Sequence, residues 1–387
     1  MLSERTGCGR VPGGFIGRQL IGSALSFGIL TALFSGPAAA DTEPWIQSIG
    51  CSDARTGTGF SIRGARFAAD GSPSVDSLVV GRLCIGSVNG VHAVPVSDGA
   101  GGAFIVWIES AGQDCDLRLQ HVSASGDPAP GWPQEGQPLC VAVGTQTQPA
   151  MVVTGAGSVL IAWKDYRDPQ QVAVYLRRVQ ASDPLVASDG SDEIVISDAL
   201  ASDPRLCSDG ASGAWLVWVQ GAMTTREIRM LHLLADGSPD PVWPSLGRAV
   251  ATGAGSAEDP TISPDGSGGV FAAWKLREES AFSLHLQRLE PTGAPAAGWP
   301  TGGVQVASSS APITVGSIAS DTSGVAIVWA SVAQDSAQAR IAWFNAGGSP
   351  RTGWQAEGRR LGGDGGESTD PVLAIGPDGS RFVSWVG

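Results

Sequence analysis

Short segments of alternating apolar and polar residues recur along the chain with a period of about 55 residues. In residues 258–274, the pattern predicts a strand, a glycine-rich turn and a second strand that ends on tryptophan. The equivalent tryptophans follow at intervals of 55 or 56 residues: Trp107, Trp163, Trp218, Trp274, Trp329 and Trp385. Scattered core tryptophans would not be spaced so evenly, so the pattern indicates a repeat protein.

Each repeat contains a second pair of strands. After the tryptophan, a third strand alternates, as in residues 284–289, and a short fourth strand follows, as in residues 304–307. We letter the four strands a to d in chain order. The c–d connection begins and ends on glycines ten positions apart: Gly71 and Gly81, Gly126 and Gly136, Gly237 and Gly247, Gly293 and Gly303, Gly348 and Gly358. A tryptophan lies within four of these connections: Trp132, Trp243, Trp299 and Trp354.

The chain enters this pattern at a c strand near Phe60 and leaves it after a b strand at Gly387. The strands therefore form complete four-stranded sheets throughout only if the two ends meet. The prediction is an all-β fold, a six-bladed β-propeller over residues 60–387. A two-plus-two seam would close it, with residues 60–69 pairing beside residues 381–386. An open array would leave unpaired strand edges at both ends, which favour aggregation.

Residues 1–40 have a different character. Three arginines precede an apolar run at 20–34, and small residues follow up to Ala40. This predicts a signal peptide cleaved after Ala40 rather than an uncleaved anchor, because the apolar run is short for a membrane span. Residues 41–59 are assigned to a leader with no predicted structure. We expect a secreted or periplasmic protein that is not inserted in a membrane after cleavage.

Charge narrows the range of partners. Cleavage would remove Arg5, Arg10, Arg18 and Glu4, which changes the net charge from −13 to −15. Such an acidic surface argues against nucleic acid and anionic lipid. We expect a monomer whose ligand is a polysaccharide or a protein.

Five cysteines remain after cleavage, so at least one is free or paired outside the chain. Cys51 precedes the first c strand and Cys115 lies in the first b–c connection, which places both on one face of neighbouring blades. We predict a Cys51–Cys115 disulfide that stabilises the seam by roughly 2–4 kcal/mol.

Two recurrent features are assigned to structure rather than to ligand binding. The a–b turns beginning at Asp98, Asp209 and Asp265 each offer one carboxylate, whereas calcium prefers several oxygen ligands, so they are predicted to be hairpin turns. One interpretation of the repeated tryptophans is that they line a sugar site. A constant phase of one per blade favours packing between sheets instead, where each indole buries roughly 150–250 Å².

One repeat carries a family resemblance. Residues 157–167, which contain Trp163, Asp165 and Arg167, followed by residues 174–180, resemble repeats of exported bacterial β-propeller proteins of the Trp-x-Asp-x-Arg type. The resemblance covers about residues 60–387, although only this repeat keeps the whole pattern. It implies secretion and a propeller, and it assigns no chemistry.

The candidate site lies on the face formed by the irregular d–a and b–c connections, because binding residues concentrate on variable loops held by a rigid scaffold. Asp203, Asp259 and Asp370 each precede a proline at an innermost strand, and Gln148 does so in another repeat. They are predicted to surround the central axis. Close carboxylates must raise their pKa or recruit a cation such as calcium. The alternative is that aspartate before proline only shapes a turn. The remaining candidates on this face are Asp165, Arg167 and Arg277.

Two functions follow from this site. No Gly-x-Ser-x-Gly elbow or His-Glu-x-x-His helix is present, and the aspartate turns depart from the sialidase box. The preferred prediction is therefore a non-catalytic module that binds a polysaccharide or a protein. The alternative is a propeller enzyme, glycosidase- or lactonase-like, with carboxylates at the channel mouth and a bound divalent metal as an option.

Overall fold

The computed structural model describes twelve parts of the chain between residues 45 and 386. Within them, the regular structure is β-strand apart from one 3₁₀ turn, η1 (Gly155–Gly157). No helix in these parts is long and apolar enough to cross a membrane. The ranges are 45–50, 60–67, 73–83, 93–111, 114–134, 136–182, 193–197, 200–251, 255–333, 336–361, 368–375 and 381–386.

The strands form antiparallel sheets that follow the order of the chain. The first has three strands: β1 (Trp45–Gly50), β2 (Phe60–Phe67) and β3 (Pro73–Leu83). Five four-stranded sheets follow. The first two are β4 (Ala93–Ser97), β5 (Ala103–Ala111), β6 (Asp114–Val122) and β7 (Gln137–Cys140), then β8 (Gln146–Thr154), β9 (Ser158–Asp165), β10 (Ala173–Gln180) and β11 (Ile194–Val195). The next is β12 (Ala201–Ser208), β13 (Ala214–Gln220), β14 (Glu227–Leu233) and β15 (Arg248–Ala251). The last two are β16 (Ser256–Pro264), β17 (Val270–Arg277), β18 (Phe282–Leu289) and β19 (Val304–Ser309), then β20 (Ile313–Asp321), β21 (Gly324–Ala333), β22 (Ser336–Asn345) and β23 (Arg359–Arg360). A two-stranded sheet, β24 (Thr369–Ile375) and β25 (Arg381–Val386), ends the described chain.

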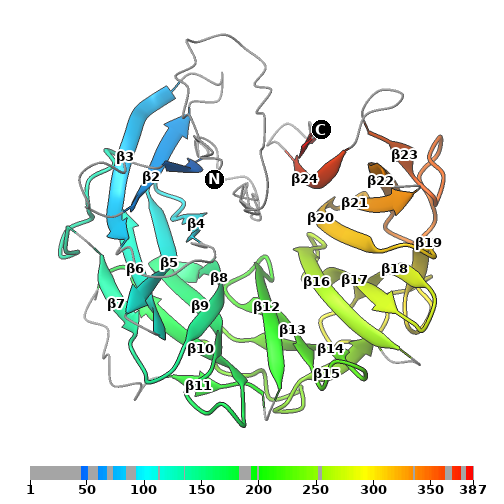
Figure 1. Cartoon of the computed structure of the whole chain (residues 1–387), viewed down its shortest axis with the longest axis horizontal. Coiled ribbons are helices and arrows are strands. Elements are labelled where there is room, and N and C mark those ends of the chain that lie inside the picture. Colours follow the sequence, from blue (N-terminus) through cyan, green and yellow to red (C-terminus); the bar gives the residue numbers. More distant parts are fainter. Residues whose placement is uncertain are drawn as a thin grey trace, which may run out of the picture.

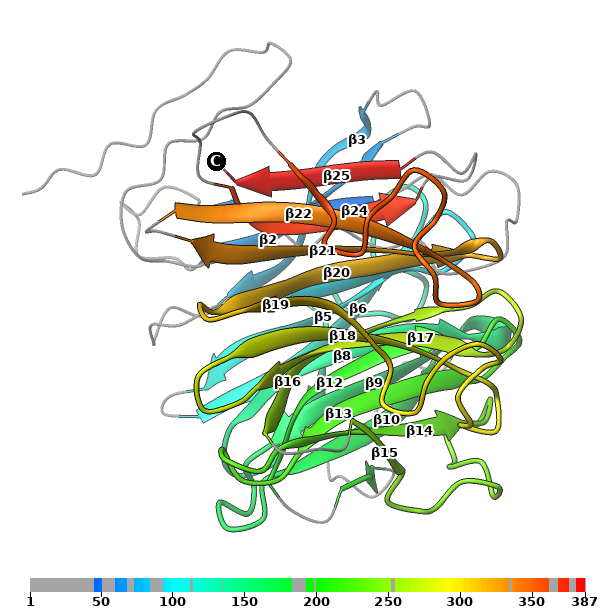
Figure 2. The same ribbon diagram turned by 90° about the vertical axis from the view of Figure 1, so that its right-hand side faces the viewer.

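The sheets are arranged around a common axis (Figure 1), with β4, β8, β12, β16, β20 and β24 innermost and each packed beside the next. The side view shows the sheets stacked on one another up to β25 (Figure 2). Each a–b pair and each c–d pair predicted from the repeat is present among the described residues. The predicted all-β class and its four-stranded sheets are confirmed.

The N-terminal sheet differs from the prediction. The region assigned to an unstructured leader contains β1, which pairs with β2 along the edge that was expected to accept β25. Within the described residues, β25 pairs with β24 alone. Pairing with β1 closes a much shorter loop than pairing with the far end of the chain, so its entropic cost is smaller.

The first c–d connection also differs from the others. Where later repeats have a long connection, β3 runs over residues 73–83 as a strand. The segment lacks the tryptophan found in four of the other connections, and Val75, Val79 and Val80 are strong strand formers. The strand therefore extends where the other repeats turn back.

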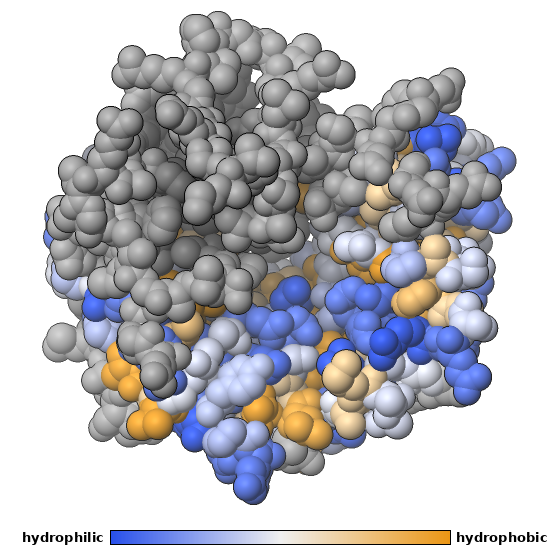
Figure 3. Space-filling view, in the orientation of Figure 1, coloured by the Kyte–Doolittle hydropathy of each residue, from blue (hydrophilic) through white to orange (hydrophobic). Residues whose placement is uncertain are grey.

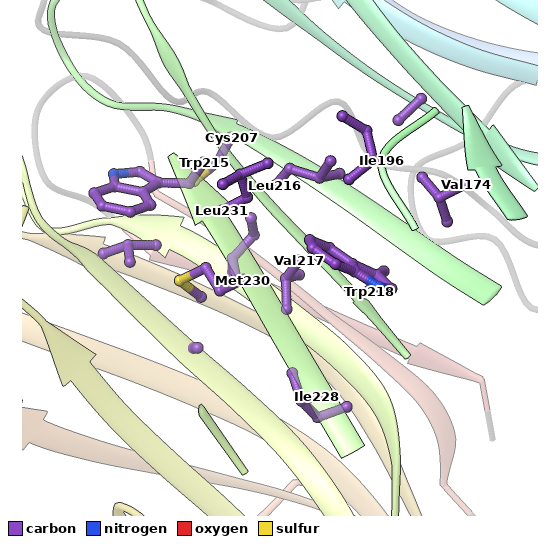
Figure 4. Close-up of a cluster of buried hydrophobic side chains, with 14 of the residues drawn as sticks. Val174, Ile196, Cys207, Trp215, Leu216, Val217, Trp218, Ile228, Met230 and Leu231 are labelled. Atoms are coloured by element: carbon purple, nitrogen blue, oxygen red, sulfur yellow. The ribbon is translucent and has the colours of Figure 1, made fainter. Parts of the chain in front are cut away.

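The repeated tryptophans pack between sheets, as predicted. Those of the b strands from Trp107 to Trp329 are at most 2% exposed. One apolar cluster runs from β8–β11 through β12–β15 to β16–β19 and contains Trp215 and Trp218 (Figure 4). The indole N–H groups of the loop tryptophans Trp132, Trp243 and Trp299 donate to the carbonyl oxygens of Ala181, Pro291 and Ala346, respectively. Each acceptor belongs to the next repeat, so these side chains join neighbouring sheets.

In three c–d connections, the second glycine makes room for the tryptophan of its own sheet. Gly136, Gly247 and Gly358 have φ of 67°, 67° and 70°. A Cβ atom there would lie 2.3–2.5 Å from the ring of the b-strand tryptophan. The glycines and the tryptophans share one period because they touch.

The aspartates of the a–b turns act as turn residues. Asp98 accepts backbone N–H bonds from Ala100 and Gly102, both at 2.8 Å, and His121 on the c strand lies 2.9 Å from its other oxygen. Burial alone would raise the pKa of Asp98, but these hydrogen bonds outweigh it and lower that pKa. Asp209 pairs likewise with His232, and Asp265 with Arg288. Each carboxylate therefore ties its turn to the neighbouring c strand.

Candidate functional site

The strand register brings the start of each a strand, the end of the b strand and the start of the c strand to one face. In the β8–β11 sheet, Gln146 pairs with Asp165, which pairs in turn with Ala173. The d–a and b–c connections therefore share this face, which we call the b–c face. The a–b turns and the c–d connections lie at the opposite ends of the strands.

Three consecutive innermost strands are bulged at the same place near the b–c face. The bulges lie between Thr147 and Ala150 in β8, between Ser202 and Arg205 in β12, and between Glu258 and Thr261 in β16. The bulged residues Gln148, Asp203 and Asp259 have φ of 53°, 52° and 54°. Side chains other than glycine rarely adopt this conformation, which costs on the order of 1–3 kcal/mol per residue. Bulges commonly re-aim a side chain beside an active site.

Gln148 and Asp203 meet across the junction of two sheets. Gln148 Nε2 donates to Asp203 Oδ1 at 2.6 Å, and the backbone N–H of Asp203 donates to Gln148 Oε1 at 3.1 Å. Ser202 Oγ donates to the second carboxylate oxygen at 3.0 Å. These donors hold the carboxylate in one orientation.

Asp259 is partnered by a lysine. Lys275 Nζ at the end of β17 lies 2.7 Å from Asp259 Oδ2 and 3.2 Å from Glu258 Oε2. Burial alone would lower the pKa of Lys275, but the two carboxylates outweigh it and raise that pKa. The ammonium therefore stays charged at neutral pH. The close carboxylates were predicted to recruit a cation. At Asp259, the Lys275 ammonium is such a cation.

No group of three or more histidine, cysteine, aspartate or glutamate side chains able to hold a metal occurs among the described residues. Asp370 lies at the equivalent place in β24, next to the bulge between Thr369 and Val372, but its side chain is outside the described part. The predicted calcium site at the axis therefore gains no ligand set from the described side chains.

Two arginines complete the cluster around Glu258. Arg226 and Arg277 both face Glu258 Oε1, at 3.6 Å and 3.5 Å. Arg277 also donates to the carbonyl oxygen of Met223 in the preceding b–c connection, at 3.1 Å. Their side chains are 28% and 39% exposed. Arg277, predicted for this face, therefore lies beside the axial carboxylates.

Asp165 and Arg167 are not brought to this cluster. The Asp165 side chain is fully buried and accepts from Trp163 Nε1 at 2.8 Å and from Arg167 at 2.7 Å. Arg167 also pairs with buried Glu193 at 2.6 Å and lies 4.0 Å above the ring centre of Tyr175. These partners belong to outer parts of the sheet, so the Trp-x-Asp-x-Arg segment forms a buried structural network. Gln220 accepts from Trp218 in the same way, at 2.9 Å.

No disulfide joins two cysteines of the described residues. Cys115 is partly exposed, whereas Cys140 and Cys207 are buried. Burial, with Glu193 and Asp165 nearby, raises the pKa of Cys140 to about 12, which makes it unreactive. Cys51 lies outside the described residues, so the Cys51–Cys115 disulfide stays a prediction.

A cleft of about 330 Å³ opens beside Arg226. It lies between the b–c connection that leads into β14 and the start of β16. Thr224, Thr225, Arg226 and Glu227 form one wall, and Ala257, Trp274, Leu276 and His285 belong to the other. On the face seen in Figure 3, hydrophilic residues gather toward the middle of the molecule over β12–β19.

Sequence reasoning missed Glu258, Lys275 and Arg226. Two signals were present, because Glu258 directly precedes the Asp259-Pro260 pair and Lys275 is one of only two lysines in the chain. Arg226 carries no such signal. Its place in the cluster depends on how two neighbouring sheets pack.

No family model and no curated protein matches this chain. Among solved structures, a polysaccharide lyase, "PL25-Ulvanlyase bound to -[GlcA(1-4)Rha3S]-", aligns over 92% of this chain and 90% of its own, with a TM-score of 0.57 and 10% identity. This chain shares the fold of that enzyme. The α-L-arabinanase of Cellvibrio cellulosa complexed with arabinohexaose aligns over 71% of this chain and 95% of its own, with a TM-score of 0.34 and 11% identity.

The comparison overturns the preferred sequence-based prediction of a non-catalytic binding module. The structure that aligns over nine-tenths of both chains is an enzyme, and the ligand-free form of the ulvan lyase gives the same result with a TM-score of 0.56. The prediction rested on the lack of standard catalytic motifs. Such motifs describe local segments, whereas this site draws its carboxylates from consecutive sheets about 55 residues apart.

Proposed function

We propose that this protein is an enzyme that cleaves glycosidic bonds in a polysaccharide, with its active site at the axial end of the b–c face. The observation that carries the proposal is the pair of carboxylates, Asp203 and Asp259, held at positive φ on adjacent innermost strands. The fold shared with the ulvan lyase supports it. Backbone strain repeated in neighbouring strands is characteristic of sites where side-chain direction matters more than stability.

The carboxylate pair favours hydrolysis. In this reaction one carboxyl group protonates the leaving glycosidic oxygen as the C–O bond breaks, and the other removes a proton from the water that attacks the anomeric carbon. Asp259, beside the Lys275 ammonium, is assigned the base role. Asp203, oriented by Gln148 and Ser202, is assigned the acid role. Elimination would require a base that abstracts a carbon-bound proton, and Lys275 is already protonated at neutral pH.

The activity test measures new reducing ends released from a panel of plant, algal and bacterial polysaccharides. We expect Asp203→Asn and Asp259→Asn each to lower kcat by at least about 100-fold, because general acid–base catalysis contributes about 10²–10⁴-fold. Asp236→Asn is the control, since Asp236 is an exposed turn residue at the other end of the sheet. Ultraviolet absorbance of an unsaturated product would instead identify elimination. Full activity in both axial variants would refute the assignment of the site.

We also propose that the sheets form the six-bladed ring predicted from the repeat, closed when β25 pairs with β2, in a protein exported by residues 1–40. The support is that β24 packs beside β20 as the next innermost strand and pairs with β25 as an a–b pair. Deleting residues 372–387 should then abolish the cooperative thermal transition. Deleting residues 45–50, which removes β1, should leave it nearly unchanged. The reverse outcome would show that β1, not β25, completes the sheet.

A further inference from the structure

The cluster at Glu258 contains more positive than negative charge. Arg226, Lys275 and Arg277 face Glu258, and Lys275 also faces Asp259, so three cations share two carboxylates. Lys275 is close to both partners and is 14% exposed. The two arginines contact Glu258 only at 3.5 Å or more, beyond a good hydrogen bond. Each guanidinium group carries five N–H donors, so each keeps donors that its contacts with Glu258 and Met223 do not use.

Partly exposed guanidinium groups with unused N–H donors suit an anionic ligand. Arginine presents planar, paired N–H donors that match a carboxylate or a sulfate, and it is only weakly hydrated. The overall negative charge of the chain does not prevent such binding, because charges farther apart than about 8 Å are largely screened at physiological salt. Glu278 lies near Gly255 of the lining, so the preference for an anion rests on the two partly exposed arginines and not on the net charge around the cleft.

The cleft next to Arg226 has the size and the lining of a sugar site. Its volume, about 330 Å³, falls at the lower end of the range for small-ligand pockets. Thr224 and Thr225 offer hydroxyl groups for hydrogen bonds, and partly buried Leu276 offers apolar surface. Glu227, the acidic residue of the lining, is paired with Arg229 and so does not oppose an anion strongly.

We infer that this cleft is a subsite for an anionic sugar, with Arg226 and Arg277 binding its carboxylate or sulfate group. The inference rests on the proposed function in one respect, namely that the ligand is part of a polysaccharide substrate. Because the subsite lies beside Glu258 and Asp259, a chain bound there would extend toward the axial carboxylates. Arg226 and Arg277 are thus residues that determine specificity, and they take no part in bond cleavage.

The kinetic test compares a uronate polysaccharide with its carboxyl-reduced, neutral form, and a sulfated polysaccharide with its desulfated form. We expect Arg226→Gln and Arg277→Gln each to raise KM for the anionic polymer about tenfold or more, because a hydrogen bond to a charged group contributes about 1.5–3 kcal/mol. The value of kcat should change little, and KM of the parent should rise with salt. Arg351→Gln, on the opposite face, is the matched control.

A binding measurement separates this inference from the proposed function. Oligosaccharides of each type are titrated by calorimetry into the parent protein and into Asp203→Asn, with Arg226→Gln for comparison. Binding of the anionic oligosaccharide that depends on Arg226 supports the subsite even if no polymer is cleaved. Cleavage of a neutral polymer with no dependence on Arg226 or Arg277 overturns the subsite and leaves the proposed function intact. If the parent protein neither binds the anionic oligosaccharide nor cleaves any polymer, both the subsite and the proposed function are overturned.

Discussion

Replacing Arg167 with methionine is expected to lower the free energy of unfolding by about 3–5 kcal/mol at neutral pH. Arg167 pairs with Asp165 and Glu193, whose side chains are 0% and 2% exposed. Burial alone would lower the pKa of Arg167, but hydrogen bonds to these carboxylates raise it. Without the guanidinium, two buried carboxylates would remain with no cation. Urea denaturation measures the loss.

The loss has a specific physical cause. In Arg167→Met, the carboxylates of Asp165 and Glu193 would stay buried with no cation beside them. An uncompensated buried charge is costly, so this loss should exceed that of removing an exposed cation.

Two further variants make this test specific. Adding Asp165→Asn and Glu193→Gln to Arg167→Met removes the buried charges and should restore most of the lost stability. Lys164→Met removes a neighbouring cation, at the end of β9, whose ring contact is with Tyr166 at 4.8 Å. This change should cost less than about 1 kcal/mol. A deficit in Arg167→Met as small as that of Lys164→Met would contradict the role given to Arg167.

The second large effect is expected from Gly247→Ala, at about 2–5 kcal/mol. An L-residue at φ of 67° costs about 1–2 kcal/mol. The added Cβ would also lie 2.5 Å from the Trp218 ring, and overpacking of this kind costs about 1–3 kcal/mol more. Trp218 is fully buried, so its ring has no room to move aside.

Gly210→Ala is the matched control for this prediction. Gly210 has φ of 83°, and nothing lies within 4 Å of an added Cβ atom. It should lose only the conformational part, about 1–2 kcal/mol. Equal losses in the two variants, measured by chemical denaturation, would show that the contact between Gly247 and Trp218 does not limit stability.

Local sequence patterns predicted most of the strands and turns of the fold. The period of Trp107, Trp163 and Trp218 indicated the repeat, and the paired glycines located the c–d connections, because both features depend on neighbouring strands of one sheet. The pattern did not predict β1, which lies before the first recognisable repeat. It assigned β3 to a connection because one glycine spacing was read as a loop.

The sequence predicted only some of the residues of the candidate site. Asp203, Asp259 and Gln148 were found because they precede proline at one phase of the repeat, and the structure places them at equivalent bulges. Asp165 and Arg167 were placed on the same face, yet their side chains turn into a buried network with Glu193. A strand pattern gives the face of a residue but not the partners that its side chain meets across a sheet junction.

The sequence by itself determined the all-β class, the repeat, the packing role of the tryptophans and the turn role of Asp98, Asp209 and Asp265. These follow from side-chain alternation, glycine conformation and turn chemistry, which act within about one repeat. Only the tertiary structure decided which side chains of different sheets meet. It joined Gln148 to Asp203, gave Asp259 the Lys275 ammonium and gathered Arg226 and Arg277 around Glu258. Those contacts depend on the packing of one sheet on the next, and packing is a property of the folded chain that no local pattern records.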